Sequence, residues 1–82
     1  MKDNEHLGIF IRKARLKSKI TQRYLSRKLG CTSQFIANWE RGASRPPLNY
    51  LRKIQKTLKI PEEQFISFLV RESLIPYKKI FK

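Results

Sequence analysis

Two threonines and two glycines divide the middle of this 82-residue chain into two short segments. Thr21 precedes eight residues that stop at Gly30. Thr32 precedes nine residues that stop at Gly42. A threonine hydroxyl can accept hydrogen bonds from the free N–H groups of a helix's first turn, and a glycine just past a helix tolerates the left-handed conformation. The pattern therefore predicts two short helices separated by a turn of three residues, 30–32.

Apolar residues at three-to-four spacing predict three further helices. The first covers residues 6–17, the next follows a loop at 43–47 and covers 48–58, and the last begins at Pro61. The apolar positions of these helices are Leu7, Phe10, Ile11 and Ala14, then Leu48, Leu51, Ile54 and Leu58, all pointing inward, and finally Phe65, Ile66, Phe68 and Leu69. We expect an all-α fold, a compact five-helix bundle in which the two central helices form a helix-turn-helix.

The length allows one domain, which we place at residues 1–72, followed by a basic and aromatic tail at residues 73–82. The single cysteine, Cys31, excludes a disulfide framework and a zinc site built from several cysteines, so no metal is expected. The amino terminus lacks a signal-peptide pattern, and the apolar runs are too short for a membrane span. We expect a cytoplasmic, nucleoid-associated protein that does not contact membranes.

The formal net charge is +13, and the charge is unevenly distributed. Between Ile9 and Ile60 the only acid is Glu40. That stretch holds the cations Arg12, Lys13, Arg15, Lys17, Lys19, Arg23, Arg27, Lys28, Arg41, Arg45, Arg52, Lys53, Lys56 and Lys59. A large field of one sign attracts polyanions, so nucleic acid is the first candidate partner, with an acidic membrane surface or an acidic protein as alternatives.

An ordered series of residues from Leu7 to Leu69 resembles the phage-repressor family of helix-turn-helix proteins. The matching residues are Leu7-Gly8 with Ile11-Arg12 and Arg15, Thr21-Gln22 with Leu25 and Leu29-Gly30, Ile36 with Trp39-Glu40-Arg41-Gly42, and Pro47 with Leu51, Ile54 and Leu58. The chain departs from the family at Cys31, where a small aliphatic residue is usual, and in continuing past the fifth helix. The resemblance implies binding to double-stranded DNA by two-fold dimers.

A helical wheel divides the segment after Thr32 into two faces. Ile36, Trp39 and Glu40 share one face, which we expect to be buried. The opposite face holds polar or small residues, and from it we expect the DNA base contacts Ser33, Gln34, Ala37 and Asn38. Glutamine and asparagine amides match the N6 and N7 edge of adenine in the major groove. Phe35 lies at the margin, where either a DNA contact or a role in covering the core is possible.

Phosphate contacts position such a protein without reading sequence. The N-terminus of the helix after Thr21 is an anion site, and the resemblance implies a side-chain contact from Gln22 there. The full set that we expect is Thr21, Gln22, Thr32, Arg41, Ser44, Arg45, Lys17 and Lys19.

Glu40 is an acid inside the most basic part of the chain. The resemblance implies that it pairs with Arg15 as a structural ion pair that ties the recognition helix to the first helix. A lone carboxylate near phosphates would repel DNA unless it were neutralised and turned away, which supports this hypothesis. The alternative is a solvated acid.

We expect a sequence-specific transcriptional regulator without catalytic residues or cofactors, because paired carboxylates, a glycine-rich phosphate loop and metal-spaced ligands are missing from the sequence. The alternatives are an antitoxin, or other protein-interaction module whose tail binds a partner, and a sequence-blind architectural DNA-binding protein. We also expect a homodimer, which DNA completes by neutralising the charge. Its contacts would come from the apolar surplus Phe65, Ile66, Phe68, Leu69 and Val70, together with Ile75, Tyr77, Ile80 and Phe81.

Overall fold

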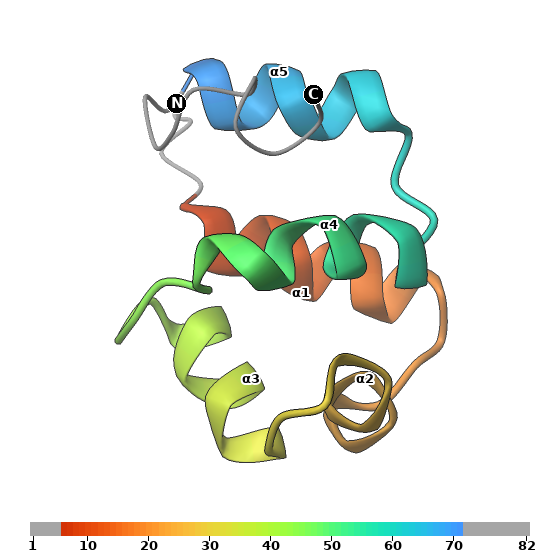
Figure 1. Ribbon diagram of the computed structural model, residues 1–82, viewed down its shortest axis with the longest axis vertical. Helices are drawn as coiled ribbons and strands as arrows, with labels where there is room; N and C mark the ends of the chain where they lie inside the picture. Colours follow the sequence, from red (N-terminus) through yellow and green to blue (C-terminus); the bar gives the residue numbers. More distant parts are fainter. Residues whose placement is uncertain (1–5, 72–82) are drawn as a thin grey trace.

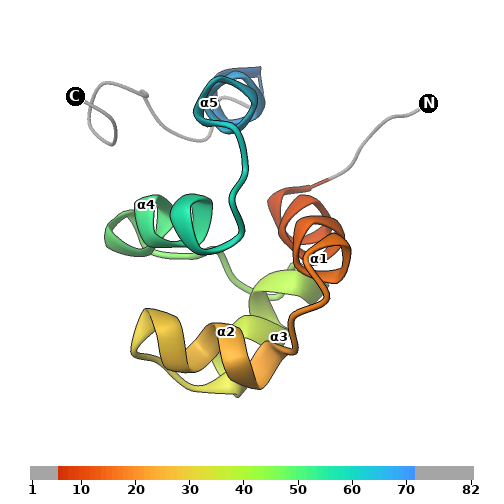
Figure 2. The same ribbon diagram turned by 90° about the vertical axis from the view of Figure 1, so that its right-hand side faces the viewer.

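The computed structural model describes residues 6–71 and contains five helices and no strand within them. The helices are α1 (Leu7–Lys17), α2 (Gln22–Leu29), α3 (Ser33–Arg41), α4 (Leu48–Thr57) and α5 (Glu62–Arg71). Figures 1 and 2 show α1 and α4 at the same level of the molecule, with α2 and α3 on one side of that level and α5 on the other. The predicted all-α architecture is confirmed. The tail at residues 73–82 lies outside the described residues.

Local cap chemistry sets the ends of α2 and α3. The Thr21 hydroxyl accepts from the N–H of Tyr24 at 3.0 Å, and the Thr32 hydroxyl accepts from the N–H of Phe35 at 3.3 Å. Both helices end at a glycine with positive φ, 78° at Gly30 and 83° at Gly42. These are the ends that the sequence predicts, and the three-residue turn fixes α2 and α3 against each other.

The core draws fully buried side chains from all five helices. Ile11, Leu25, Ile36, Ile54 and Phe65 have no exposed surface. The prediction for Leu48 was wrong, because 48% of this residue is exposed. At roughly 100° per residue, Leu48 lies about 60° from Leu51 and about 120° from Ile54, so it falls at the edge of the face that the buried residues of α4 share.

Two close contacts place α1 relative to the rest. The ring of Phe10 lies 4.5 Å from that of Phe68, which joins α1 to α5. On the other side, a Cβ added at Gly8 would lie 1.9 Å from the carbonyl oxygen of Trp39. The backbones of α1 and α3 therefore approach so closely that only glycine fits, and this contact holds α3 against the scaffold.

The apolar residues of α5 serve mainly the core of their own chain. Phe65, Phe68 and Leu69 are buried, and Ile66 is half-buried. Val70 is the member of the expected surplus that is clearly exposed, at 46%. The apolar surface that α5 offers to a second copy is therefore smaller than the sequence led us to expect, because α5 lies over α1 and α4 and places these residues in the core (Figure 2).

Candidate nucleic-acid interface

The two faces of α3 are divided as the wheel predicts. Ile36, Trp39 and Glu40 are buried. The remaining positions of the helix lie at or near the surface: Ser33, Gln34, Phe35 and Arg41 are exposed, and Ala37 and Asn38 are half-buried. The four expected base-contact residues thus form one accessible strip, in which half-buried Ala37 and Asn38 are flanked by more exposed neighbours.

Hydrogen bonds join Gln34 and Asn38 of this strip to each other and to the neighbouring Arg41. Gln34 Nε2 donates to Asn38 Oδ1 at 3.1 Å, and Arg41 Nη2 donates to the same oxygen at 2.5 Å. A carbonyl oxygen has two lone pairs, so both acceptor positions of Asn38 are in use. A bidentate contact from Asn38 to adenine needs that oxygen as an acceptor, so at least one of these bonds must open when a base is bound.

The opposite face of α3 is anchored by a buried carboxylate. Arg15 Nε lies 2.7 Å from Glu40 Oε2, and Arg15 Nη2 lies 3.1 Å from Oε1. The two side chains are only 9% and 4% exposed. Arg15 Nη1 also donates to the carbonyl oxygen of Ile20 at 2.7 Å. The arginine therefore links α1, the α1–α2 connector and α3, and Glu40 faces away from the surface strip.

Gln22 also binds Glu40, and the sequence did not predict this third member of the cluster. Its Nε2 donates to Glu40 Oε1 at 3.0 Å, so the first residue of α2 is bonded directly to α3. The amide keeps a second N–H, because an NH₂ group carries two donors. Gln22 was expected only as a phosphate contact. No sequence signal marks the bond, since the two residues are 18 positions apart and meet only once α2 and α3 are packed.

Residues 11–65, two thirds of the chain, match the family model described as helix-turn-helix. The chain belongs to the phage-repressor-like helix-turn-helix family. It is also 35% identical, over 66 residues, to a protein of Rhodospirillum rubrum whose name is "uncharacterized transcriptional regulator in ATPase CF(0) region". The alignment covers 80% of this chain and 61% of that relative, so the chain spans about three fifths of the relative's length. No solved structure matches the chain.

In this helix-turn-helix protein the expected phosphate residues lie on both sides of α3. Figure 1 shows α2 on one side of α3 and the α3–α4 loop on the other. Arg41, Ser44 and Arg45 are exposed at the end of α3 and in that loop. The other members lie at the end of α1, in the α1–α2 connector or at helix starts: Lys17, Lys19, Thr21, Gln22 and Thr32. Thr21 and Thr32 are exposed even though their hydroxyls cap helices.

Phe35, at the margin of the two faces of α3, is partly packed against Trp39 and partly accessible at the surface. It is 49% exposed, and its ring centroid lies 6.4 Å from that of Trp39. One side of the ring thus covers the core, and the remainder stands at the surface beside Gln34. Cys31 packs against the core as a half-buried residue, and burial raises the pKa of its thiol.

Residues 6–71 provide neither a metal site nor a membrane span. No group of three or more histidine, cysteine or acidic side chains lies close enough there to hold a metal ion. No helix in that part of the chain is both long and apolar enough to cross a bilayer.

Proposed function

We propose that this protein is a transcriptional regulator that binds a specific double-stranded DNA sequence by placing α3 in the major groove. The observation that carries the proposal is the division of α3 into two faces. The amide side chains of Gln34 and Asn38 lie on the surface strip, and the carboxylate of Glu40 is buried on the opposite face, where Arg15 neutralises it. Membership of the helix-turn-helix family and the name of the Rhodospirillum relative support it.

Base recognition is assigned to Ser33, Gln34, Ala37 and Asn38. Gln34 and Asn38 each present a donor and an acceptor side by side, which suits the N6 and N7 edge of adenine. Ala37 is small enough to let the helix approach a thymine methyl group. Because Asn38 holds two internal hydrogen bonds, opening them costs free energy, which a base with the complementary edge repays and a mismatched base does not.

Phosphate binding is assigned to the residues on both sides of α3. At the start of α2, backbone N–H groups and the positive end of the helix favour an anion. Gln22 adds its second amide N–H there, and its bond to Glu40 holds the side chain in one orientation. Positioning by phosphates on both sides fixes the depth and angle of α3 in the groove. The full set is Lys17, Lys19, Thr21, Gln22, Thr32, Arg41, Ser44 and Arg45.

We infer that two copies bind one operator. A single α3 contacts only a few base pairs, and two-fold dimers of such modules place their recognition helices one DNA turn apart, about 34 Å. In the described residues of α5, Val70 and half-buried Ile66 are the apolar groups available for a contact between copies. Residues 73–82 are the other candidate contact. Two chains at +13 each repel, so the dimer forms fully on DNA, where phosphates neutralise the charge.

Selection of bound DNA from a random pool tests the function. The expected result is an enriched, roughly palindromic sequence with adenines in each half-site. A sequence-blind architectural protein is the second candidate, favoured by the net charge of +13. Repeated selection rounds that enrich no sequence, although DNA is bound, would support that candidate and refute sequence-specific reading.

A further inference from the structure

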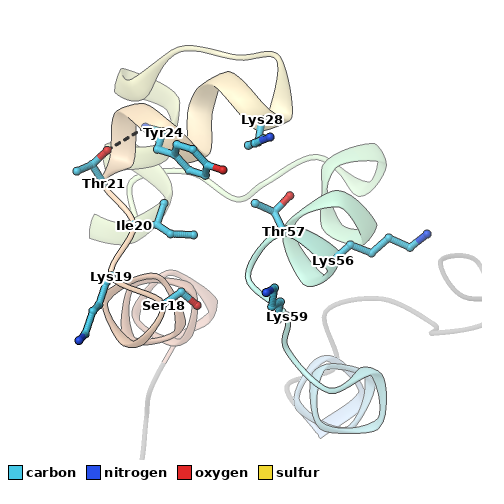
Figure 3. Close-up of a pocket in the computed structure, with 9 residues that line it drawn as sticks. All are labelled: Ser18, Lys19, Ile20, Thr21, Tyr24, Lys28, Lys56, Thr57 and Lys59. Carbon is cyan, nitrogen blue, oxygen red and sulfur yellow. Dashed lines mark hydrogen bonds between the residues drawn. The ribbon is translucent and has the colours of Figure 1, made fainter.

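An open groove with lysines on several sides lies between α2, the end of α4 and the α1–α2 connector (Figure 3). It encloses about 790 Å³. Lys19, Lys28, Lys56 and Lys59 line it, and we call it the lysine groove. In Figure 3, Lys28 and Lys59 flank the opening, whereas Lys19 and Lys56 extend outward at opposite ends.

The charged residues that line the lysine groove are all positive. The lining includes the hydroxyl residues Ser18, Thr21 and Thr57 as well as the four lysines, and no acid. Ammonium groups that share a groove repel one another, so this arrangement costs stability in the free protein and is relieved when an anion enters. Ser18 Oγ donates to the carbonyl oxygen of Leu58 at 3.3 Å, whereas the hydroxyls of Thr21 and Thr57 are donors of the kind that contact phosphate oxygens.

Two lysines of the groove also have an unusual backbone conformation. Lys19 and Lys59 have positive φ angles of 60° and 56°, and they are the non-glycine residues with positive φ in the described part of the chain. Each lies just after the C-cap of a helix, where glycine is the usual residue. A side chain is disfavoured in that conformation, because its Cβ lies too close to the following carbonyl oxygen. The protein therefore carries two strained lysines at positions where glycine would relieve the strain but remove the charge.

We propose that the lysine groove binds the sugar–phosphate backbone of the DNA duplex that α3 reads, alongside the N-terminus of α2. This inference rests on the proposed function. The groove is continuous with the proposed phosphate contacts, because Lys19 and Thr21 belong to both. It brings in Lys28, Lys56 and Lys59, which the phosphate set leaves unused. An open groove fits a continuous chain of phosphates better than one small anion.

The experiment compares salt dependence of binding for two variants of equal charge. The groove variant carries Lys28→Gln and Lys59→Asn, because asparagine tolerates positive φ. The control variant carries Arg12→Gln and Lys53→Gln, which are exposed and do not line the groove. Anisotropy titrations use one fixed random-sequence duplex of about two helical turns, roughly 20 base pairs, since backbone contacts do not depend on sequence. Circular dichroism establishes that both variants fold.

The slope of log K against log salt is negative, and each lost phosphate contact reduces its magnitude by about 0.9. The groove variant is expected to lose about 1.8 from the slope, so between 50 and 200 mM salt the wild type loses roughly twelvefold more affinity than the variant does. The control variant is expected to change the slope by less than half as much. Equal slopes for the two variants would overturn the proposal.

A second arm separates the DNA backbone from a free phosphate compound. Inorganic tripolyphosphate is titrated into the free protein and into the groove variant by calorimetry. Tight one-to-one binding that the variant loses, with an unchanged DNA slope, would identify a small polyphosphate as the occupant and overturn the assignment to DNA. These outcomes are distinct from failure of the proposed function, in which selection enriches no sequence whatever the slopes are.

Discussion

Removing the Glu40 carboxylate is expected to destabilise the protein severely, because it leaves the Arg15 guanidinium buried without its partner. The side chain of Arg15 is only 9% exposed, so water does little to hydrate its charge. It would keep its bond to the Ile20 carbonyl oxygen and lose both bonds to the carboxylate. Breaking a buried pair from one side costs about 3–5 kcal/mol. Gln22 would lose its acceptor as well.

This loss is large against the whole stability of so small a chain, about 4–12 kcal/mol at roughly 0.05–0.15 kcal/mol per residue. One kcal/mol corresponds to about 4–8 °C in Tm for a domain of this size, so Glu40→Ala should lower Tm by at least about 12 °C. Thermal unfolding followed by circular dichroism measures the change. Glu63→Ala is the matched control, since Glu63 is exposed in the first turn of α5 and its loss should cost under about 1 kcal/mol.

A double variant keeps the test decisive if Glu40→Ala does not fold. Replacing the pair by Arg15→Met with Glu40→Leu removes both charges together, and such exchanges are often neutral or stabilising. The double variant should therefore be more stable than Glu40→Ala alone. The reasoning is refuted if Glu40→Ala melts within about 3 °C of Glu63→Ala, because that difference is under 1 kcal/mol.

Three further predictions concern base reading, the packing of α1 against α3 and the contact between copies. Gln34→Ala or Asn38→Ala should cost about 1–3 kcal/mol in affinity for the selected site and little on random DNA; equal losses on both would rule out base reading. Gly8→Ala should lower Tm despite the better helix propensity of alanine, because the new Cβ would meet the Trp39 carbonyl oxygen; an unchanged or raised Tm would show that α1 and α3 can separate without cost. Deleting residues 73–82 should make binding to a two-half-site duplex less cooperative with single-site affinity kept; unchanged cooperativity in ultracentrifugation would remove that segment from the contact between copies.

Sequence reasoning located α2 and α3 well because their ends are set by interactions within a single turn. The hydroxyls of Thr21 and Thr32 act on residues three positions ahead, and Gly30 and Gly42 need only their own backbone freedom. The buried and exposed faces of α3 followed from periodicity alone for the same reason. Local signals of this kind do not depend on how the helices are packed.

Features that arise from packing were not predictable in the same way. The bond from Gln22 to Glu40 exists because the turn brings the start of α2 against α3. His6 caps α1 by accepting from the N–H of Ile9 at 3.3 Å, an uncommon use of an imidazole that its sequence position does not reveal. Leu48 has an apolar side chain like a core residue, but its angular position on α4 leaves it exposed.

The expected apolar surplus of α5 was also misjudged because it depends on packing. Its apolar residues were too many for one helix face when α5 was considered alone. In the fold α5 packs against α1 through Phe10 and covers one side of the bundle, so Phe65, Phe68 and Leu69 are all used internally. A count of apolar residues cannot distinguish a wide internal face from an interface, because that depends on which helices are neighbours.

The most direct test of base reading by α3 is to replace adenines of the selected site, one at a time, by 7-deazaadenine. This base keeps Watson–Crick pairing and the minor groove but lacks the N7 acceptor that a glutamine or asparagine amide contacts in the major groove. We expect at least about a fivefold loss of affinity at one or more adenines, corresponding to about 1 kcal/mol, and no further loss at the same position in the Gln34→Ala or Asn38→Ala variant that lacks the contact. Unchanged affinity at every substituted adenine would contradict base reading by α3.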